Sequence, residues 1–390
     1  MTMRAALDPA DRALLDRVQT GVPLVPRPFA ALAEALGSGE AEVLERLARL
    51  AGAGVLRQIG GIFDTRACGY ASALVAARVS PGGLDAAAAA VGAHPGVSHC
   101  YERAHAWRLW FTLAVPPTSG LGLDGTVARL RTQAGVDAMR VLPALRTFKI
   151  AARFDLDVAE RRGGRDPRGL SGARPLSGIA SDTFRDRGGH AGLQRGTRNP
   201  PTAAGGQGAG PGHPRAAAVA ALGDVDVEVV RVLQRPLALE ATPFAAPARA
   251  AGLGTDGLLA RAAALGERGV MRRFAGLLNH RRAGFGANAM AVWALPAERR
   301  EEAGHRMAEL PAVTHCYERP TFPDWPYALF SMVHGRTRAE CEATIAAIAG
   351  AVRPDAAAIL WTVREFKKTR LQLFTPEYAA WEAGTLEVIR

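Results

Sequence analysis

His99-Cys100-Tyr101-Glu102-Arg103 occurs a second time, residue for residue, as His315-Cys316-Tyr317-Glu318-Arg319. Core packing repeats apolar residue types, so an identical run of His, Tyr, Glu and Arg needs another explanation. The repetition predicts two copies of one module, each carrying the same polar group of side chains. A repeated polar group in turn suggests a ligand that itself has repeated chemical groups.

The similarity between the two copies extends beyond this run. Residues 55–66 align with residues 270–281, and each copy ends on Phe-Lys, at 148–149 and at 366–367. Two modules of about 150 residues each match the usual size of a domain and leave a surplus in the middle of the chain.

The surplus, residues 158–218, is rich in Gly and Pro and has no sustained apolar period. Segments of this composition bury too little surface to offset their ordering entropy, so a disordered linker is expected. Residues 161–215 hold ten Arg and three Asp, which is +7 of the net charge of +11 and leaves about +4 for the modules. A basic tether explains this charge better than a nucleic-acid-binding arm.

The four cysteines, at 68, 100, 316 and 341, form no Cys-x-x-Cys pair and no cluster with His. This favours a reducing compartment and argues against a structural metal site. Charged residues interrupt the start of the chain before an apolar leader develops. The longest apolar runs, such as 109–115, are too short to span a bilayer. The sequence therefore predicts a cytoplasmic protein without a membrane segment.

Each copy begins with helical patterns. Val43, Leu47 and Leu50 recur at intervals of three or four residues, which marks one buried helix face. The predicted helices of the two copies are 11–18, 28–36 and 39–50, then 229–233, 244–251 and 258–265. Three short helices followed by a β-like run are typical of a winged helix-turn-helix.

A β-α-β-β-α-β order follows the helices. In the first copy the predicted strands are 70–79, 97–103, 109–115 and 141–150, with helices over 84–93 and 124–134. This order is the ferredoxin-like arrangement. The predicted fold class is therefore α+β: a tandem repeat of a winged helix-turn-helix plus a ferredoxin-like domain. The expected divisions are helix-turn-helix 1–65, ferredoxin-like 66–157, linker 158–218, helix-turn-helix 219–280, ferredoxin-like 281–375 and a C-terminal tail 376–390.

The repeated run lies in a predicted strand, where alternate side chains share a face. His99, Tyr101 and Arg103 should point one way, and Ser98, Cys100 and Glu102 the other. Many basic residues gather near the same predicted sheet. Arginine forks bind carboxylates and lysine adds point charge, so a broad, flat anion with several carboxylates and an apolar face fits this surface.

The domain order resembles the Lrp/AsnC transcription regulators, which makes a DNA-binding regulator an alternative function. Its recognition helix should offer basic side chains to phosphate and base edges. The first candidate helix, 38–50, begins with Glu40, Glu42 and Glu45, and the second, 254–265, has Asp256 and a single Arg. Phosphate repels such surfaces, so nucleic acid is an unexpected partner.

Longer stretches resemble the siroheme decarboxylase family. They are 94–103, with 109–113, in the first copy, and 272–285, 287–290, 325–330 and 365–368 in the second. The resemblance covers both modules and omits only the linker. The chain looks like the fused, two-module form associated with haem d1 biosynthesis.

This resemblance implies that siroheme loses carbon dioxide from two acetate side chains to give 12,18-didecarboxysiroheme. The macrocycle can accept the electrons, so no added cofactor and no protein-bound metal are expected. The catalytic candidates are His99, His315, His280, Tyr101 and Tyr317. The candidates for binding the retained carboxylates are Arg57, Arg66, Arg103, Arg272, Arg273, Arg281, Arg319, Lys149, Lys367 and Lys368. A histidine is the natural proton donor near neutral pH, although one histidine could instead bind the iron.

The expected partner is thus siroheme alone, with no membrane. The two modules should associate as an internal pseudo-dimer, and association into a larger homo-oligomer is left open. A tetrapyrrole-sensing regulator on the same scaffold is the alternative that the sequence does not exclude.

Overall fold

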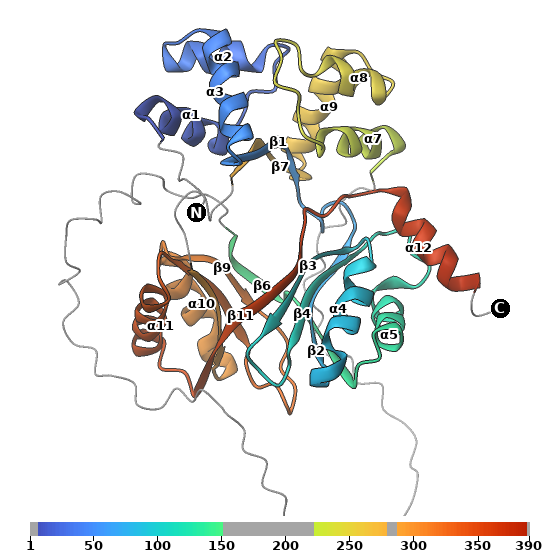
Figure 1. Cartoon of the computed structure of the whole chain (residues 1–390), viewed down its shortest axis with the longest axis vertical. Helices are drawn as coiled ribbons and strands as arrows, with labels where there is room; N and C mark the ends of the chain where they lie inside the picture. The colour runs from blue at the N-terminus through green and yellow to red at the C-terminus, as the bar shows by residue number, and fades with distance from the viewer. Residues whose placement is uncertain (1–6, 151–221, 279–286, 388–390) are drawn as a thin grey trace, which may run out of the picture.

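A computed structural model describes residues 7–150, 222–278 and 287–387 (Figure 1). The expected linker, His280 and Arg281 therefore lie outside the described residues. Within these ranges, no helix has both the length and the apolar character needed to cross a membrane.

Two three-helix units form one end of the molecule (Figure 1). Helix α1 begins with a capping box, in which Asp8 and Asp11 each accept a hydrogen bond from the other's backbone N–H. The apolar faces of both units belong to one continuous hydrophobic core. The helices are α1 (Pro9–Thr20), α2 (Pro28–Leu36) and α3 (Glu40–Gly52), then α7 (Asp224–Leu233), α8 (Ala245–Ala250) and α9 (Thr255–Glu267).

The strands that follow these helices pair with each other across the modules. Strands β1 (Leu56–Phe63) and β7 (Met271–Leu278) form a two-stranded antiparallel sheet, which we call the wing. Gly276 allows α1 to approach the wing, because a Cβ at this position would lie 2.4 Å from a methyl group of Val18. The wing therefore joins the two helical units rather than serving each one separately.

The remaining strands form one nine-stranded sheet, in the order β5-β2-β4-β3-β11-β8-β10-β9-β6. The neighbouring pairs within it are antiparallel. Its strands are β2 (Ala71–Arg78), β3 (Val97–Arg103), β4 (Leu109–Val115), β5 (Ala138–Pro143), β6 (Arg146–Ile150), β8 (Ala287–Ala294), β9 (Val313–Glu318), β10 (Leu329–Gly335) and β11 (Ala356–Lys368).

This sheet closes into a barrel, because its two edge strands follow each other in the chain. Only Ala144 and Leu145 separate β5 at one edge from β6 at the other. β5–β6 thus acts as one long strand that crosses from the first module to the second. β11 crosses in the opposite direction, since 356–361 pair with β8 and 362–368 pair with β3.

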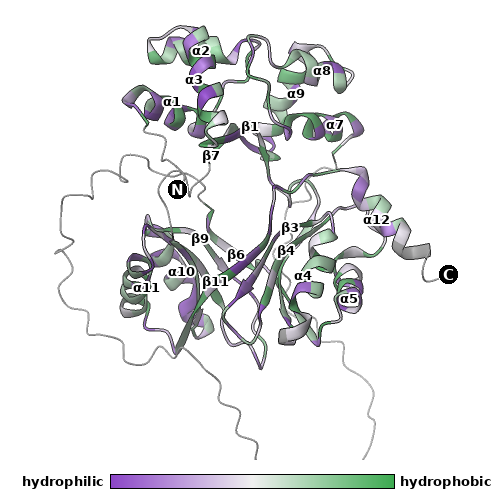
Figure 2. Cartoon of the chain, in the orientation of Figure 1, coloured by the Kyte–Doolittle hydropathy of each residue, from purple (hydrophilic) through white to green (hydrophobic). Residues whose placement is uncertain are grey.

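The crossing strands add pairings that the sequence analysis did not predict. The expected strand 141–150 comprises the second half of β5 and all of β6, and its second part pairs with β9 of the other module. The two ferredoxin-like units therefore share one sheet instead of forming separate sheets. Alternate side chains of a strand still face either the covering helices or the barrel interior. Figure 2 shows hydrophilic and hydrophobic residues mixed along β11.

The barrel has helices outside and aromatic residues inside. Helices α4 (Leu84–Ala93) and α5 (Gly122–Ala134) cover the strands of the first module, and α10 (Ala297–Glu309) and α11 (Arg338–Val352) cover those of the second (Figure 1). A separate core of residues from both modules fills the interior, with Trp107, Trp110 and Trp325 all about 1% exposed. This core occupies the end of the barrel far from the wing.

The segment expected to be a C-terminal tail begins with a helix, α12 (Pro376–Glu387), which lies beside α4 and α5 in Figure 1. Tyr378 and Trp381 pack against the buried ring of His94, with ring centroids 5.1 and 4.1 Å away. Tyr378 also lies 3.1 Å, oxygen to oxygen, from Thr126. The end of the second module is thus anchored on the first.

Candidate functional site

The repeated histidines lie at the wing-facing end of the barrel, where β3 and β9 begin. The register shifts between Val97 and His99 in β3, and a matching shift occurs beside Val313 in β9. Such bulges redirect side chains. As a result Val97 and Cys100 both face the helices, although strict alternation would separate them.

The bulges also correct the expected position of Ser98. The sequence placed Ser98 on the face opposite His99, but the Ser98 hydroxyl lies 2.9 Å from His99 Nδ1. Thr314 Oγ1 lies at the same distance from His315 Nδ1. A hydroxyl residue before the histidine in each copy was the sequence signal for this contact. The hydroxyls fix the ring orientation and leave Nε2 as the nitrogen available to a ligand.

The two copies keep the same arrangement behind each histidine. The rings of His99 and Tyr101 are 6.0 Å apart, and those of His315 and Tyr317 are 6.1 Å apart. In both modules these residues share the face of the barrel interior, since Tyr101 lies opposite Trp110 and Tyr317 lies opposite Phe330. The structure therefore brings all four of these catalytic candidates to one barrel.

Both histidines are neutral at pH 7. Burial, aided by the charges of Lys368 and Arg57, lowers the pKa of His99 to about 4. Burial also lowers the pKa of His315 to about 4, with further contributions from His99 and Arg272. Because charges act on the pKa only over short distances, these effects indicate that the two histidines lie near each other and near the arginines of the wing.

The wing provides one arginine above each histidine, at equivalent positions of β1 and β7. Arg272 is paired with Asp64, whose carboxylate lies 2.7 Å from its guanidinium and whose pKa is lowered despite the burial that opposes ionisation. Arg57 has Asn279 at the position corresponding to Asp64, outside the described residues. Sequence reasoning missed the Asp64–Arg272 pair, which joins the two modules.

Arg103 and Arg319 occupy structural positions rather than the ligand-facing positions expected from the sequence. They are only 5% and 9% exposed. Arg103 donates to the carbonyl of Leu360 at 3.0 Å, and Arg319 donates to the carbonyl of Leu142. Burial lowers the pKa of each arginine to about 10. Each guanidinium therefore holds the long strand at the point where it crosses between the modules.

Lys149 and Lys367 also lie away from the histidines. Lys367 donates to the carbonyls of Gly92 and His94 at the end of α4, and Lys149 donates to that of Leu310 after α10. These contacts place both lysines on the helix-covered face of the sheet. A cation at a helix C-terminus complements the helix dipole, so the repeated Phe-Lys ending of the two copies has a structural explanation.

The other basic candidates divide in a similar way. Lys368 pairs in register with His99, and its ammonium lies 3.9 Å from the Glu365 carboxylate. Arg66 is exposed in the turn between β1 and β2, and Arg273 is half-buried in the wing. The structure thus brings Arg57, Arg272 and Lys368 to the histidines. Arg103 and Arg319 lie behind them, with their guanidinium groups over the rings of Tyr101 and Tyr317, and Lys149 and Lys367 lie on the other face of the sheet.

Comparisons with known proteins bear on this arrangement. Residues 11–57 and 226–272 match the family described as "Siroheme decarboxylase NirDL-like HTH domain". Residues 67–149 and 282–367 match that described as "AsnC-like ligand binding domain". The chain is 33% identical, over 94% of its length and 96% of the relative's, to a siroheme decarboxylase of Hydrogenobacter thermophilus. This chain belongs to the siroheme decarboxylase family.

Other siroheme decarboxylases extend the similarity. The NirDL subunit of the Paracoccus denitrificans enzyme is 34% identical over 87% of this chain and 89% of its own length. The crystal structure of a siroheme decarboxylase NirDL matches with a TM-score of 0.71 at 29% identity, covering 97% of this chain and 99% of that one. The likeness confirms the tandem helix-turn-helix and AsnC-like architecture.

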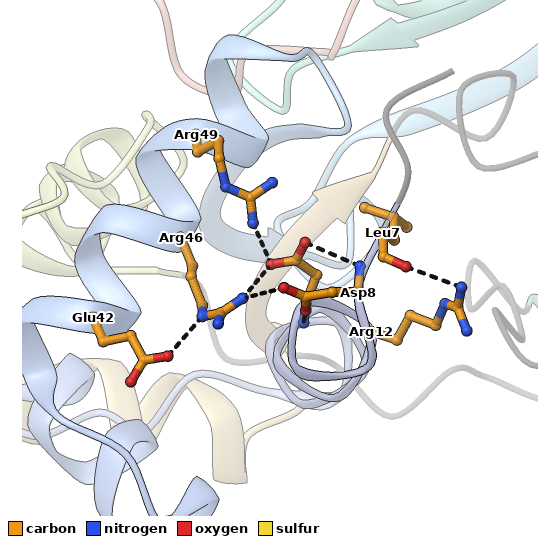
Figure 3. Close-up of polar contacts among 7 residues, drawn as sticks. Leu7, Asp8, Arg12, Glu42, Arg46 and Arg49 are labelled. Carbon is orange, nitrogen blue, oxygen red and sulfur yellow. Dashed lines mark hydrogen bonds and ion pairs between the residues drawn. The ribbon is translucent and has the colours of Figure 1, made fainter. Parts of the chain in front are cut away.

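In this siroheme decarboxylase family member, the arginines of the first recognition helix bind acidic residues of the same unit (Figure 3). Arg46 contacts the carboxylates of Asp8, Asp11 and Glu42 at 2.7, 3.0 and 2.9 Å, and Arg49 also pairs with Asp11. The second unit repeats the pattern, since Arg261 and Arg268 pair with Asp226. The guanidinium groups in these pairs are bound to carboxylates, whereas a DNA-binding helix would direct them to phosphate.

Buried histidines predict an acid-sensitive fold. Burial, aided by Lys367, lowers the pKa of His94 to about 4, the same value as for His99 and His315. Since the folded-state pKa is below the unfolded value of about 6.5, the unfolded chain binds more protons between these values. Stability should be complete above pH 6.5 and fall as pH decreases towards 4, by about 3 kcal/mol for His94 alone.

His94→Leu tests this expectation, because Leu310 occupies the equivalent position in the second module. Urea unfolding followed by tryptophan fluorescence between pH 7.5 and 4.5 should show a shallower loss of stability in the variant. Equal slopes for the variant and the wild type would contradict a linked titration of His94.

Proposed function

We propose that this chain decarboxylates siroheme to 12,18-didecarboxysiroheme, as a step in haem d1 biosynthesis. The observation that carries the proposal is the paired His-Tyr arrangement under the wing arginines, in a member of this family. A related NirDL structure was solved with an iron-uroporphyrin III analogue. Siroheme is likewise a flat iron tetrapyrrole that carries carboxylates.

The reaction needs one electron-pair acceptor and one proton for each acetate group. The bond between the CH₂ carbon and the carboxylate breaks, and carbon dioxide leaves without the electron pair. The macrocycle disperses that pair until a proton reaches the CH₂ carbon and forms a methyl group. Because the substrate supplies the electron acceptor, we propose that the enzyme needs no added cofactor.

The histidines are the proposed source of the proton. In the free protein they are neutral, because burial lowers the pKa of both to about 4. The carboxylates of a bound substrate bring the opposite charge and favour the protonated ring. Substrate binding and proton loading are therefore coupled: the site takes up protons as siroheme binds and releases one to each new methyl group.

Tyr101 and Tyr317 stand beside these histidines and complete the polar lining. Burial raises the pKa of Tyr317, so its hydroxyl stays protonated and can donate a hydrogen bond to a carboxylate. Arg57, Arg272 and Lys368 lie near these histidines, and they are the proposed binding groups for carboxylates that the reaction keeps. The four cysteines are free and buried, which is consistent with the proposed location in the reducing cytoplasm.

Anaerobic incubation of the purified protein with siroheme, followed by mass spectrometry of the extracted tetrapyrrole, tests the proposed activity. We expect the loss of two molecules of carbon dioxide from each siroheme. Tightly bound but unchanged siroheme would contradict it and favour a tetrapyrrole-sensing regulator. Salt-dependent binding of DNA would then be the measurement that supports the regulator.

A further inference from the structure

The two histidines have closely similar sequence neighbours but different spatial neighbours. Within β3 and β9 the copies match, including the hydroxyl on each Nδ1 and the tyrosine two residues later. The differences come from the strands that cross between modules. Each histidine therefore lies beside a strand from the other half of the chain.

The crossing strands place charged residues opposite His99 and Tyr101, but uncharged residues opposite His315 and Tyr317. β11 places Lys368 opposite His99 and Glu365 opposite Tyr101. At the equivalent positions, β6 places Ile150 opposite His315 and Thr147 opposite Tyr317. Where one histidine has an ammonium group as its neighbour, the other has a branched alkyl chain.

The strand on the other side of each histidine repeats this difference. Thr112 of β4 lies opposite His99, and its hydroxyl accepts the His99 backbone N–H at 3.2 Å and contacts Ser98 at 2.8 Å. Met332 of β10 takes the equivalent place opposite His315. A polar hydroxyl is thus replaced by a thioether, which packs as an apolar group.

The wing adds charge to the same side. Arg272, above His315, has its guanidinium paired with the Asp64 carboxylate at 2.7 Å, which offsets its charge. Arg57, above His99, contributes positive charge together with Lys368. Two cations therefore act on His99, with Glu365 beside Lys368, whereas His315 has the paired Arg272 above it and Ile150 and Met332 on either side.

From these contacts we propose that the two half-sites have different tasks. The half-site of His99, Lys368 and Arg57 holds carboxylates that are kept, and the half-site of His315, Ile150 and Met332 is where each acetate loses carbon dioxide. This inference rests on the proposed function and adds to it that a single half-site performs both decarboxylations. The substrate must then be repositioned between the two steps.

The chemistry of carboxylates explains the division. A carboxylate held by ammonium and guanidinium groups is stabilised as an anion, and so is harder to decarboxylate. A carboxylate placed against apolar side chains loses hydration, while its charge disperses into the macrocycle as carbon dioxide leaves. His315, near the same carbon, then delivers the proton to the CH₂ carbon.

Exchanging the two distinguishing side chains tests the proposal. Ile150→Lys should lower the single-turnover rate about 10- to 100-fold, with the dissociation constant for siroheme unchanged or lower. Both steps should slow in proportion, so the peak fraction of monodecarboxylated product should match that of the wild type. Lys368→Ile should instead raise the dissociation constant about tenfold, the usual size of one charge-assisted hydrogen bond, and keep the rate of the bound complex.

Leu145→Lys is the matched control, because it adds the same charge to the same crossing strand at a position of similar exposure, 53% against 42% for Ile150, beside Glu318 instead of His315. It should leave both the rate and the dissociation constant unchanged. If Ile150→Lys blocks one decarboxylation and monodecarboxylated product accumulates, each half-site treats one acetate and the proposal is overturned. A wild-type protein that returns siroheme unchanged would instead contradict the proposed function itself.

Discussion

His315→Ala is expected to lower kcat for siroheme decarboxylation by about 10²- to 10⁴-fold, the usual contribution of a positioned proton donor. The dissociation constant for siroheme should change much less, because His315 is neutral in the free protein and Ile150 and Met332 border it. Stopped-flow absorbance for binding and mass spectrometry of quenched single turnovers separate the two quantities.

His99→Ala is the matched comparison, since it removes the same ring with the same hydroxyl contact. It should lower kcat less than His315→Ala does. Equal losses of kcat in the two variants would show that both histidines deliver protons. Normal turnover by both variants would move the chemistry away from this end of the barrel.

Arg319→Ala is expected to reduce the free energy of unfolding by about 2–4 kcal/mol, through an unsatisfied buried carbonyl and a small cavity. The guanidinium donates to the carbonyl of Leu142 where the first crossing strand passes between modules. Urea unfolding, followed through the tryptophans inside the barrel, gives the change. Siroheme affinity of the folded variant should remain within about threefold of the wild type, a difference under 1 kcal/mol.

Arg66→Ala serves as the control, because Arg66 is exposed in a turn. Its stability should stay within about 0.5 kcal/mol of the wild type. A variant of Arg319 that folds with full stability but no longer binds siroheme would restore the carboxylate-binding role expected from the sequence.

Periodicity and the repeat were enough to predict the tandem architecture. Two predicted strands, 97–103 and 109–115, and the helix 84–93 have the bounds that the structure shows. These elements are local, since each one forms a single apolar pattern with clear ends. The crossing strands were not predicted, because an alternating pattern does not reveal which partner a strand pairs with.

The candidate site was predicted in part for the same reason. The His-Tyr pairs follow from the repeat, and the structure brings them together as expected. The basic residues were harder to assign, because the sequence does not show whether an arginine binds a backbone carbonyl or a substrate carboxylate. The β-bulge that turns Ser98 towards His99 cannot be recognised from the sequence of one copy alone.

Six of the ten basic candidates for carboxylate binding belong to the second copy in the sequence. The structure changes the meaning of this observation. Lys368 belongs to the second copy in sequence, yet it lies opposite His99 of the first. Assigning a residue to a site by its position in the chain therefore fails wherever two modules exchange strands.

The strand exchange also determines how assembly of the barrel depends on protein concentration. Each half of the barrel is completed by a strand from the other half, and residues 138–150 and 356–368 supply these strands within one polypeptide. A covalent connection of this kind holds the two halves at an effective concentration that can reach the millimolar range. Assembly of the barrel is thus a first-order event, and its completeness does not depend on how much protein the cell makes.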